Sequence, residues 1–370
     1  MTIKYNRNIS VIGGGCAGYS IVKELSKCRK NIIDFYLGSK ISNNNFWGFW
    51  NFDDINDLEK VIKHKWEKWK IIDQENETLF QSDNHPYCVT SRNDWIQFCK
   101  NNIKDENVSF FDEDISYKNN FFYRKDSEKI NSDLIIDCRS FQISTDTYLQ
   151  HFKGFIIETD NEIFDDSTAI LMDFRCDQSN GIQFIYLLPI TKRMALIEPT
   201  IYSYRIESDE FYYKSMEKYL RDIYKVNKFK IISEEKGAIP LASFKNDYIP
   251  NVINLGLKGN ANRISSGYTF YFIQKQVKGL SRKVNLSYKI NNSKIHSKLI
   301  NFLDRIFIDV LKSNPSKAPQ IFQSFGKSFN GDDMAFFMSS KIKIIPILKM
   351  IFNLPTKIFI KSFIRCLFND

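Results

Sequence analysis

The chain has 370 residues, of which 43% are hydrophobic and 15% aromatic, and it carries a net charge of +9 at pH 7. This length and apolar content exclude a disordered chain and predict about two domains around a large core. Its 7 cysteines form no C-x-x-C pair and its 4 histidines are far apart, so we expect free thiols in a reducing cytosol and no metal site. The excess positive charge falls within residues 281–370, which favours an anionic partner surface, either a membrane or a nucleic acid.

Residues 8–37 predict the opening β-α-β unit of a doubly wound α/β fold. A short buried strand at 8–12 leads into a glycine turn, and apolar residues then recur at helical spacing before a second strand. Gly13, Gly15 and Gly18 have the spacing G-x-G-x-x-G, which permits a tight turn, close approach of a pyrophosphate and helix–strand packing. The N–H groups at the start of the helix favour phosphates. We therefore expect dinucleotide binding, with a chance glycine-rich turn as the alternative.

The acidic residue that usually binds the adenosine ribose is missing from this unit. Such a residue normally ends the second strand, but here Asp34 comes early and Gly38 or Ser39 occupies the position. Either the ribose is recognised by other groups, or the glycine turn is purely structural.

Residues 43–58 form an aromatic segment, NNNFWGFWNFDDINDL, that is too irregular for a strand and too apolar for an exposed loop. Trp47, Phe49 and Trp50 would either line a substrate tunnel or pack in the core. The 32 Phe and 18 Tyr of the chain are what an aromatic-lined cavity would need, although an ordinary core would also account for them.

The rest of the chain alternates between strand-rich and helical segments. From residue 151 to residue 203, apolar runs bounded by turn residues predict four strands, and a strand with a glycine turn returns at 252–260. Further elements are expected as an amphipathic helix capped by Ser91 at 91–103, a buried strand at 132–140, a helix at 208–224 and a helix at 265–280 capped by Ser265 or Ser266.

This order of elements predicts a dinucleotide-binding sheet that is interrupted by a β-rich insert. We expect a Rossmann-like FAD-binding domain, a β-rich substrate-domain insertion and a helical C-terminal region. The FAD-binding domain would begin at 1–150 and be completed at 241–285, the insert would span 151–240, and the basic helical region 286–370. This layout is typical of flavoproteins rather than of simple nicotinamide dehydrogenases.

The most apolar part of the C-terminal region, residues 344–360, is too interrupted to cross a bilayer. Two lysines and two prolines break it, and apolar residues interleaved with lysines suit a segment that lies on a membrane surface. A packed helical subdomain with a solvated lysine face is the alternative.

Five sequence blocks occur in the order found in one family of enzymes. They are FWGFWNFDD, LIIDCRS, the long central block at 151–203, EEKGAIPL and NRISSGYTF. Within the central block lie an M-D-x-R stretch, an F-x-Y-x-L-P strand and a strand ending in Glu-x-T. In these blocks the chain resembles the lycopene cyclases of the bacterial and plant flavoprotein type, over about residues 8–280 and more loosely beyond.

The resemblance implies an enzyme that closes the ψ-ends of lycopene, or of a related linear carotene, to β-ionone rings. It implies FAD in its reduced form, NAD(P)H as the reductant and no net redox change. It also implies a peripheral location on the cytoplasmic membrane, because lycopene is a long hydrocarbon that partitions into bilayers. It argues against nucleic-acid binding, and no base-reading motif accompanies the basic charge.

The resemblance places the candidate acid at Glu198 in the Glu-x-T motif, and further candidate catalytic residues at Asp173 and Arg175 in the M-D-x-R motif. Glu198 closes an apolar run, so burial would raise its pKa and keep the carboxyl protonated as a general acid. An exposed glutamate at a strand end is the alternative. Asp173 and Arg175 would form a structural ion pair, or would orient the flavin or Glu198. Pro199, in the middle of Glu-x-T, departs from the family pattern.

Two further groups of residues are expected to contact ligands. The FAD would contact Gly13, Gly14, Gly15, Cys16, Ala17, Gly18, Arg139, Gly256, Gly259 and Gly267. The substrate would contact Trp47, Phe49, Trp50, Phe184 and Tyr186. Ordinary turn or cap glycines are the alternative for Gly259 and Gly267.

Two other functions stay open. A flavin oxidoreductase, such as a hydroxylase or a prenyl reductase, shares the nucleotide fold, and a carotenoid or flavin carrier without activity would bind the same ligands. A product of unchanged mass with a shortened chromophore would indicate cyclisation, whereas a gain of oxygen or hydrogen would indicate redox chemistry.

Overall fold

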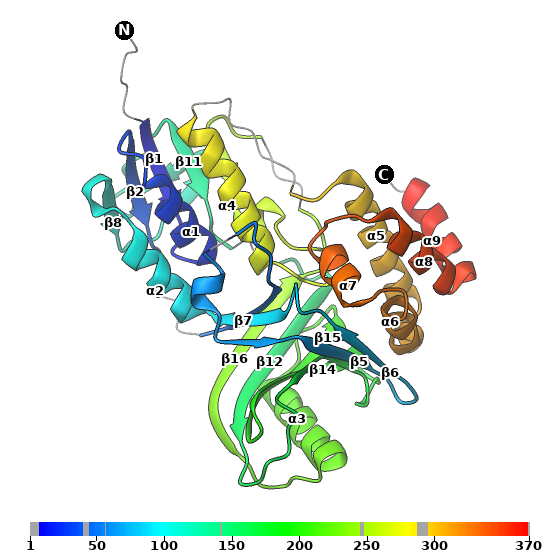
Figure 1. Ribbon diagram of the computed structural model, residues 1–370. Helices are drawn as coiled ribbons and strands as arrows, with labels where there is room; N and C mark the ends of the chain where they lie inside the picture. Colours follow the sequence, from blue (N-terminus) through cyan, green and yellow to red (C-terminus); the bar gives the residue numbers. More distant parts are fainter. Residues whose placement is uncertain are drawn as a thin grey trace.

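The computed structural model describes residues 7–39, 44–55, 57–140, 143–244, 248–286 and 295–368. In this part of the chain a parallel sheet lies above a larger mixed sheet, and a group of C-terminal helices lies beside the larger sheet (Figure 1). The prediction of an α/β fold with a β-rich insertion and a helical C-terminal region is confirmed.

The parallel sheet has the strand order β17-β11-β1-β2-β8. Its strands are β1 (Arg7–Ile12), β2 (Asn31–Tyr36), β8 (Val108–Phe111), β11 (Leu134–Asp137) and β17 (Val252–Asn254). On one face, helix α1 (Cys16–Leu25) packs between α2 (Arg92–Asn102) and α4 (Phe270–Asn285). The hairpin of β9 (Ser116–Lys118) and β10 (Phe121–Tyr123) contributes to the core on the other face. Because both faces are covered, the strands read as apolar runs.

The mixed sheet has the strand order β16-β12-β15-β14-β13-β5-β6. Its strands are β5 (Lys68–Ile72), β6 (Glu77–Gln81), β12 (Leu149–Glu158), β13 (Thr168–Asp173), β14 (Ile182–Thr191), β15 (Met194–Ser203) and β16 (Lys230–Pro240). Helix α3 (Asp209–Tyr224) covers one face (Figure 1). The domain organisation expected from the sequence placed residues 68–81 in the FAD-binding part, but β5 and β6 extend this sheet through a parallel pairing of β5 with β13.

The aromatic segment at 43–58 contains a regular strand, so the expectation of an irregular segment was wrong. Strand β3 (Phe46–Trp50) pairs antiparallel with β7 (Tyr87–Ser91), which also pairs with β4 (His64–Trp66). The pairing partner is distant in sequence, so the local pattern carried no signal for it.

Two of the expected helices are confirmed, α2 with the cap predicted for it. Ser91 accepts a hydrogen bond from the Asp94 N–H at the start of α2, and Ser208 accepts one from the Phe211 N–H at the start of α3. The helix expected at 265–280 instead begins at Phe270, and neither Ser265 nor Ser266 caps it. Residues 265–269 form a turn because Gly267 has a φ of +67°.

The C-terminal region consists of helices that pack on one another and on the mixed sheet. They are α5 (Lys298–Ser313), α6 (Ala318–Gly326), α7 (Gly331–Met338), α8 (Ile344–Asn353) and α9 (Thr356–Phe368). Helix α5 contacts α9, α6 contacts α8 and β5, and α7 contacts β6. Among the described residues, no helix combines the length and the apolar character that crossing a membrane would require.

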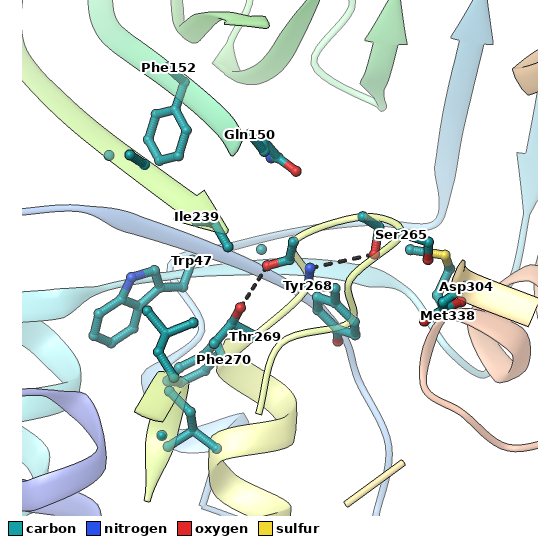
Figure 2. Close-up of a pocket in the computed structure, with 18 of the residues that line it drawn as sticks. Trp47, Gln150, Phe152, Ile239, Ser265, Tyr268, Thr269, Phe270, Asp304 and Met338 are labelled. Atoms are coloured by element: carbon teal, nitrogen blue, oxygen red, sulfur yellow. Dashed lines mark hydrogen bonds between the residues drawn. The ribbon is translucent and has the colours of Figure 1, made fainter. Parts of the chain in front are cut away.

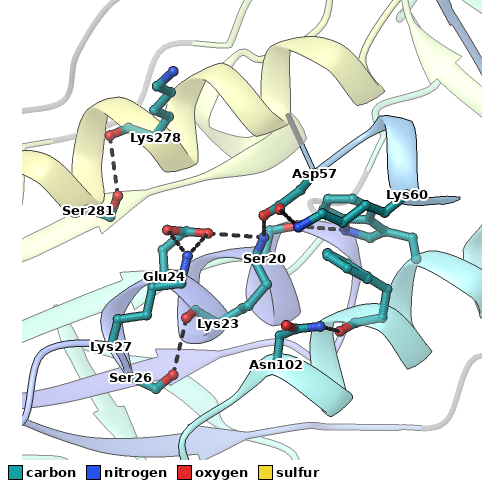
Figure 3. Close-up of polar contacts among 12 residues, drawn as sticks. Ser20, Lys23, Glu24, Ser26, Lys27, Asp57, Lys60, Asn102, Lys278 and Ser281 are labelled. Atoms are coloured by element: carbon teal, nitrogen blue, oxygen red, sulfur yellow. Dashed lines mark hydrogen bonds and ion pairs between the residues drawn. The ribbon is translucent and has the colours of Figure 1, made fainter. Parts of the chain in front are cut away.

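A buried lysine attaches the segment after β3 to α1 (Figure 3). The Lys23 side chain on α1 is 4% exposed; its ammonium forms ion pairs with Asp57 and, at 3.0 Å, with Glu24. The same ammonium lies 5.3 Å from the ring centroid of Trp95 and 5.2 Å from that of Phe98 on α2. Because a buried charge is stable only when it is paired, these contacts hold the chain that follows β3 in a defined place.

Candidate functional site

A cavity of about 1160 Å³ lies between the parallel sheet, the mixed sheet and the C-terminal helices. Typical small-ligand pockets have volumes of roughly 300–1,000 Å³. This cavity therefore has room for a large cofactor and part of a second ligand. Its lining comes from the glycine turn, β3, one face of the mixed sheet, the turn at 265–269 and helices α5 to α9.

The glycine turn forms one end of the cavity. Gly13, Gly14, Gly15, Cys16 and Ala17 line it. Gly15 is the N-cap of α1 and makes no side-chain cap, so the first N–H groups of the helix are not satisfied within it. A Cβ atom added at Gly15 would meet no atom within 4 Å, which leaves room for a ligand against the backbone. This end has the backbone donors and the dipole that hold a pyrophosphate.

Two of the expected cofactor glycines have a structural role. Gly18 does not line the cavity, and a Cβ there would lie 1.9 Å from the Gly13 carbonyl oxygen. Gly259 also lies outside the lining, and a Cβ there would lie 2.5 Å from the Asn254 carbonyl oxygen. Both positions therefore need glycine for close backbone packing.

Arg139, Gly256 and Gly267 line the same cavity. The Arg139 guanidinium is 2.8 Å from the Asp137 carboxylate and donates to the Ile115 carbonyl oxygen at 2.6 Å. These contacts fix the guanidinium in place beside the glycine turn.

An acidic side chain does lie beside the end of β2, but it comes from a different strand. Asp114, which follows β8, accepts hydrogen bonds from the Ser39 N–H at 2.9 Å and the Ser39 hydroxyl at 2.6 Å. Glu113, Asp114 and Ser39 all line the cavity. Sequence reasoning missed these acids because it searched only the end of the second strand. The acidic residues that directly follow the two phenylalanines of β8 were the signal in the sequence.

Most of the expected substrate residues line the cavity, which has an aromatic wall. Trp47, Trp50, Phe184 and Tyr186 are part of the lining. Trp47 stacks on Phe270 with ring centroids 4.9 Å apart, and Figure 2 shows this pair across the cavity from Gln150 and Phe152. Phe49 is fully buried, lies outside the lining and packs in the core.

Glu198 is an acidic residue in an apolar part of this wall. It lies on β15, is 7% exposed, and lines the cavity among Phe184, Tyr186 and Tyr202. Its carboxyl accepts a hydrogen bond from the Thr200 hydroxyl at 3.1 Å. Burial raises the pKa of Glu198 to about 8, while the Thr200 hydroxyl lowers it slightly. The carboxyl is therefore protonated at neutral pH and has a proton to donate.

Asp173 and Arg175 lie on the opposite face of the mixed sheet. Asp173 accepts a hydrogen bond from the Tyr219 hydroxyl of α3 at 2.7 Å, and the Arg175 guanidinium is 2.6 Å from the same carboxylate. Neither residue lines the cavity. The hydrogen bond with Asp173 raises the pKa of Arg175. The hydrogen bond from Tyr219 to Asp173 connects α3 to β13.

The C-terminal helices form the other end of the cavity. Side chains of α5, α8 and α9 line it, among them Phe302, Met350, Ile351, Phe359, Ile360 and Phe363. Sequence reasoning assigned this region to a membrane surface and did not predict that it forms cavity wall. The helical spacing of its apolar residues indicated that each helix has a buried face. It did not indicate which residues pack against those faces.

Comparison with known proteins decides the family. A sequence profile described as "Lycopene cyclase protein" matches residues 8–346. The chain belongs to the lycopene cyclase family. The resemblance inferred from the five sequence blocks is thereby confirmed. No curated protein sequence matches this family member.

Solved structures share the fold of this lycopene cyclase family member at low sequence identity. A geranylgeranyl bacteriochlorophyll reductase-like protein from Thermoplasma acidophilum is 12% identical with a TM-score of 0.64, covering 98% of this chain and 99% of that one. A flavin-dependent halogenase from a Brevundimonas species is 8% identical with a TM-score of 0.56, over 99% and 98% of the two chains. A 2-methyl-3-hydroxypyridine-5-carboxylic acid oxygenase is 11% identical with a TM-score of 0.54, over 93% and 98%. These similarities establish the overall fold.

Proposed function

We propose that this protein is a lycopene β-cyclase, which closes the ψ-ends of lycopene or a related linear carotene to β-ionone rings. The observation that carries the proposal is the buried carboxyl of Glu198 in an aromatic-lined cavity that extends to the C-terminal helices. An isolated alkene is a weak base, so its protonation needs a positioned acid in a site that excludes water.

The residues at the glycine turn fit FAD. Its pyrophosphate would lie at the start of α1 against Gly14, Gly15 and Ala17, where the backbone donors are available. Its ribose hydroxyls would donate hydrogen bonds to the Asp114 carboxylate. Gly256 and Gly267 would allow the backbone to approach the cofactor closely. Reduced by NAD(P)H, a bound flavin supplies an electron-rich surface that stabilises positive charge.

Side chains of this protein would donate the proton and stabilise the cation. The O–H bond of Glu198 breaks and a C–H bond forms at the terminal alkene, leaving a tertiary cation on the neighbouring carbon. A second double bond of the carotene closes the ring by forming a carbon–carbon bond. Transfer of one ring proton to the Glu198 carboxylate would end the reaction and restore the acid. One proton enters and one leaves, so the mass is unchanged. The faces of Trp47 and Phe184 would stabilise the cation by about 0.5–2 kcal/mol each.

Anaerobic incubation with lycopene in liposomes, FAD and NADPH tests the proposal. We expect a product of the same mass as lycopene with a shortened chromophore. A product that has gained hydrogen, or one that gains oxygen when the incubation is repeated in air, would support the second candidate, a flavin-dependent prenyl reductase or hydroxylase. The similarity in fold to a reductase-like protein is the observation that favours this candidate. Binding of lycopene without any product would instead indicate a carrier.

A pair of glycine variants tests the cofactor site. Gly15→Val should weaken FAD binding at least about tenfold, or about 1.4 kcal/mol, because its side chain would enter the open space where no protein atom lies within 4 Å. Its free energy of unfolding should stay close to that of the wild type. Gly18→Ala should instead lower the free energy of unfolding by about 1–3 kcal/mol, because its Cβ would lie 1.9 Å from a carbonyl oxygen. Flavin fluorescence titration and urea denaturation measure the two effects. Equal FAD affinity of Gly15→Val and the wild type would contradict this site.

We further propose that the cavity opens toward a membrane on which α8 and α9 lie. Apolar side chains of both helices are exposed, and three of them, Ile351, Ile360 and Phe363, also line the cavity. A hydrocarbon substrate could pass from the bilayer to this opening without crossing water. Exposed lysines flank these side chains and suit anionic headgroups, which attract lysines by about 1 kcal/mol each. The location would be peripheral, on the cytoplasmic membrane.

Charge reversal tests this orientation. The triple variant Lys349→Glu, Lys357→Glu, Lys361→Glu should bind vesicles containing anionic lipid on the order of 100-fold more weakly, as three attractions are lost. A control triple variant, Lys118→Glu, Lys218→Glu, Lys228→Glu, changes exposed lysines on other elements and should bind normally. Vesicle sedimentation at low and high salt measures both. Equal losses in the two variants would show that net charge alone decides binding.

A further inference from the structure

We propose that Glu235 is a positioning residue for Glu198, and that its protonated carboxyl donates a hydrogen bond to the Glu198 carboxylate once Glu198 has released its proton. This inference rests on the proposed function, because it assigns a partner to the proposed acid. It concerns a residue that does not line the cavity and that the sequence analysis did not single out within the EEKGAIPL block.

The register of the mixed sheet places the two glutamates in one row, that is, in one line of paired residues that runs across neighbouring strands. Glu235 on β16 is paired with Gly154 on β12, and the β12–β15 register, in which Phe152 pairs with Thr200 and Phe155 with Ile197, places Gly154 opposite Glu198. Side chains of residues in such a row point to the same face of a sheet. Since neighbouring strands are about 4.8 Å apart, the two glutamates are separated by a single strand.

Because Gly154 has no side chain, the Glu235 side chain and Cδ1 of Leu196 can approach the middle strand above it. A Cβ at Gly154 would lie 2.9 Å from Cγ and 3.1 Å from Oε1 of Glu235, so the Glu235 side chain leans over this glycine toward β15. Any larger residue in the middle strand would push the two carboxyl groups apart.

The surroundings of Glu235 favour a protonated carboxyl with one oxygen free to donate. Glu235 is 4% exposed, and its Oε2 accepts a hydrogen bond from the Phe46 N–H at 2.6 Å. Its Oε1 is buried without a hydrogen-bond partner among the described residues. No ion pair involves either glutamate in the described part of the chain. A buried carboxyl without a cation is most stable in the neutral form.

The other titratable groups in the row are neutral hydroxyls. Tyr186 on β14 is paired with Glu198, and its hydroxyl lies 2.9 Å from that of Tyr87 on β7. Burial raises the pKa of both tyrosines. Lys153, next to Gly154 on β12, forms its ion pairs with Asp209 and Glu234 on the opposite face.

The repulsion between the two carboxyl groups supports this assignment. Burial, and then the negative charge of Glu198, raise the pKa of Glu235 well above its ordinary value, while the Phe46 N–H lowers it. Two buried carboxyl groups in one row do not both ionise. Once Glu198 has released its proton, Glu235 therefore keeps its own as a donor. A hydrogen bond to a carboxylate makes the parent acid stronger, which the protonation of an alkene requires.

Two variants of Glu235 separate the donor from simple packing. Glu235→Leu removes the donor; we expect kcat to fall about 10- to 100-fold, the factor that a hydrogen bond to a charged group supplies. In the plot of kcat against pH, the alkaline limb should move to higher pH. KM should be nearly unchanged, because Glu235 does not line the cavity. Glu235→Gln keeps an N–H donor and should restore most of kcat. Equal losses in both variants, or wild-type kcat in Glu235→Leu, would overturn the proposal.

A spectroscopic titration keeps this test independent of turnover. The carboxyl stretching band that disappears in Glu198→Gln reports the ionisation of Glu198, and its pKa should rise in Glu235→Leu but not in Glu235→Gln. Gly154→Ala provides a second route, since its methyl group should raise the same pKa with both glutamates present. An unchanged pKa in Glu235→Leu and Gly154→Ala overturns the inference. Shifted pKa values in a protein that never cyclises lycopene would support the pair and refute only the proposed function.

Discussion

Glu198→Gln is expected to lower the rate of lycopene cyclisation by about 10²- to 10⁴-fold, the contribution typical of a general acid. The glutamine has nearly the same shape and can still contact Thr200, but it has no acidic proton for the alkene. Product formation from lycopene in liposomes measures the effect. Flavin binding should be unchanged, because Glu198 lies on the mixed sheet and not at the glycine turn.

The pH dependence gives a second readout for the same residue. In the proposed mechanism the protonated form of Glu198 is the active one, so cyclisation by the wild type should fall as pH rises through about 8. Folding responds in the same direction: a carboxyl whose pKa is raised in the folded state binds more protons there, so its contribution to stability is lost as pH rises from its ordinary pKa to about 8. Glu198→Gln removes this loss and should be at least as stable as the wild type at pH 8.

A matched control distinguishes the acid from a general loss of charge. Glu158, at the exposed end of β12, is a glutamate in the same sheet, and Glu158→Gln should leave cyclisation unchanged. Wild-type activity in Glu198→Gln would refute the assignment of the acid, and a less stable Glu198→Gln at pH 8 would contradict the raised pKa.

Asp304→Ala should lower the free energy of unfolding by about 3–5 kcal/mol, the largest stability effect expected in the chain. Asp304 on α5 receives two hydrogen bonds from Arg263, at 3.1 and 2.5 Å, and both side chains are almost fully buried. Arg263 also donates to the Phe337 carbonyl oxygen at the end of α7. Without Asp304 the guanidinium is left buried and unpaired, so α5 and α7 lose their shared attachment to the segment before α4.

Urea denaturation of three proteins tests this prediction. The double variant Arg263→Met, Asp304→Leu removes both charges and should recover much of the lost stability, since a buried pair can often be replaced by apolar side chains. Asp309→Ala breaks the partly exposed pair with Arg365 and should cost at most about 1 kcal/mol. Equal losses for Asp304→Ala and Asp309→Ala would show that burial of the first pair does not matter.

Local patterns along the chain were sufficient for several features. The glycine spacing predicted the turn before α1, Ser91 predicted where α2 begins, and apolar spacing predicted α3. The apolar run before Glu198 predicted a buried carboxyl. Each of these depends on neighbours within a few residues, such as a cap, a period of apolar side chains or a glycine in a turn. The family blocks added the order of the elements.

The tertiary structure alone decided which distant segments meet. Strands β5 and β6 join the mixed sheet, and β3 pairs with β7 in a separate small sheet. Asp114 lies beside Ser39 because β8 is the parallel neighbour of β2. Glu235 and Glu198 share one row of the mixed sheet because β12, with Gly154 at that position, lies between their strands. The sequence by itself determined the glycine turn, the buried acid and the basic apolar end of the chain. It did not determine the cavity that joins them, because strand register and helix packing depend on contacts between residues that are far apart in the sequence.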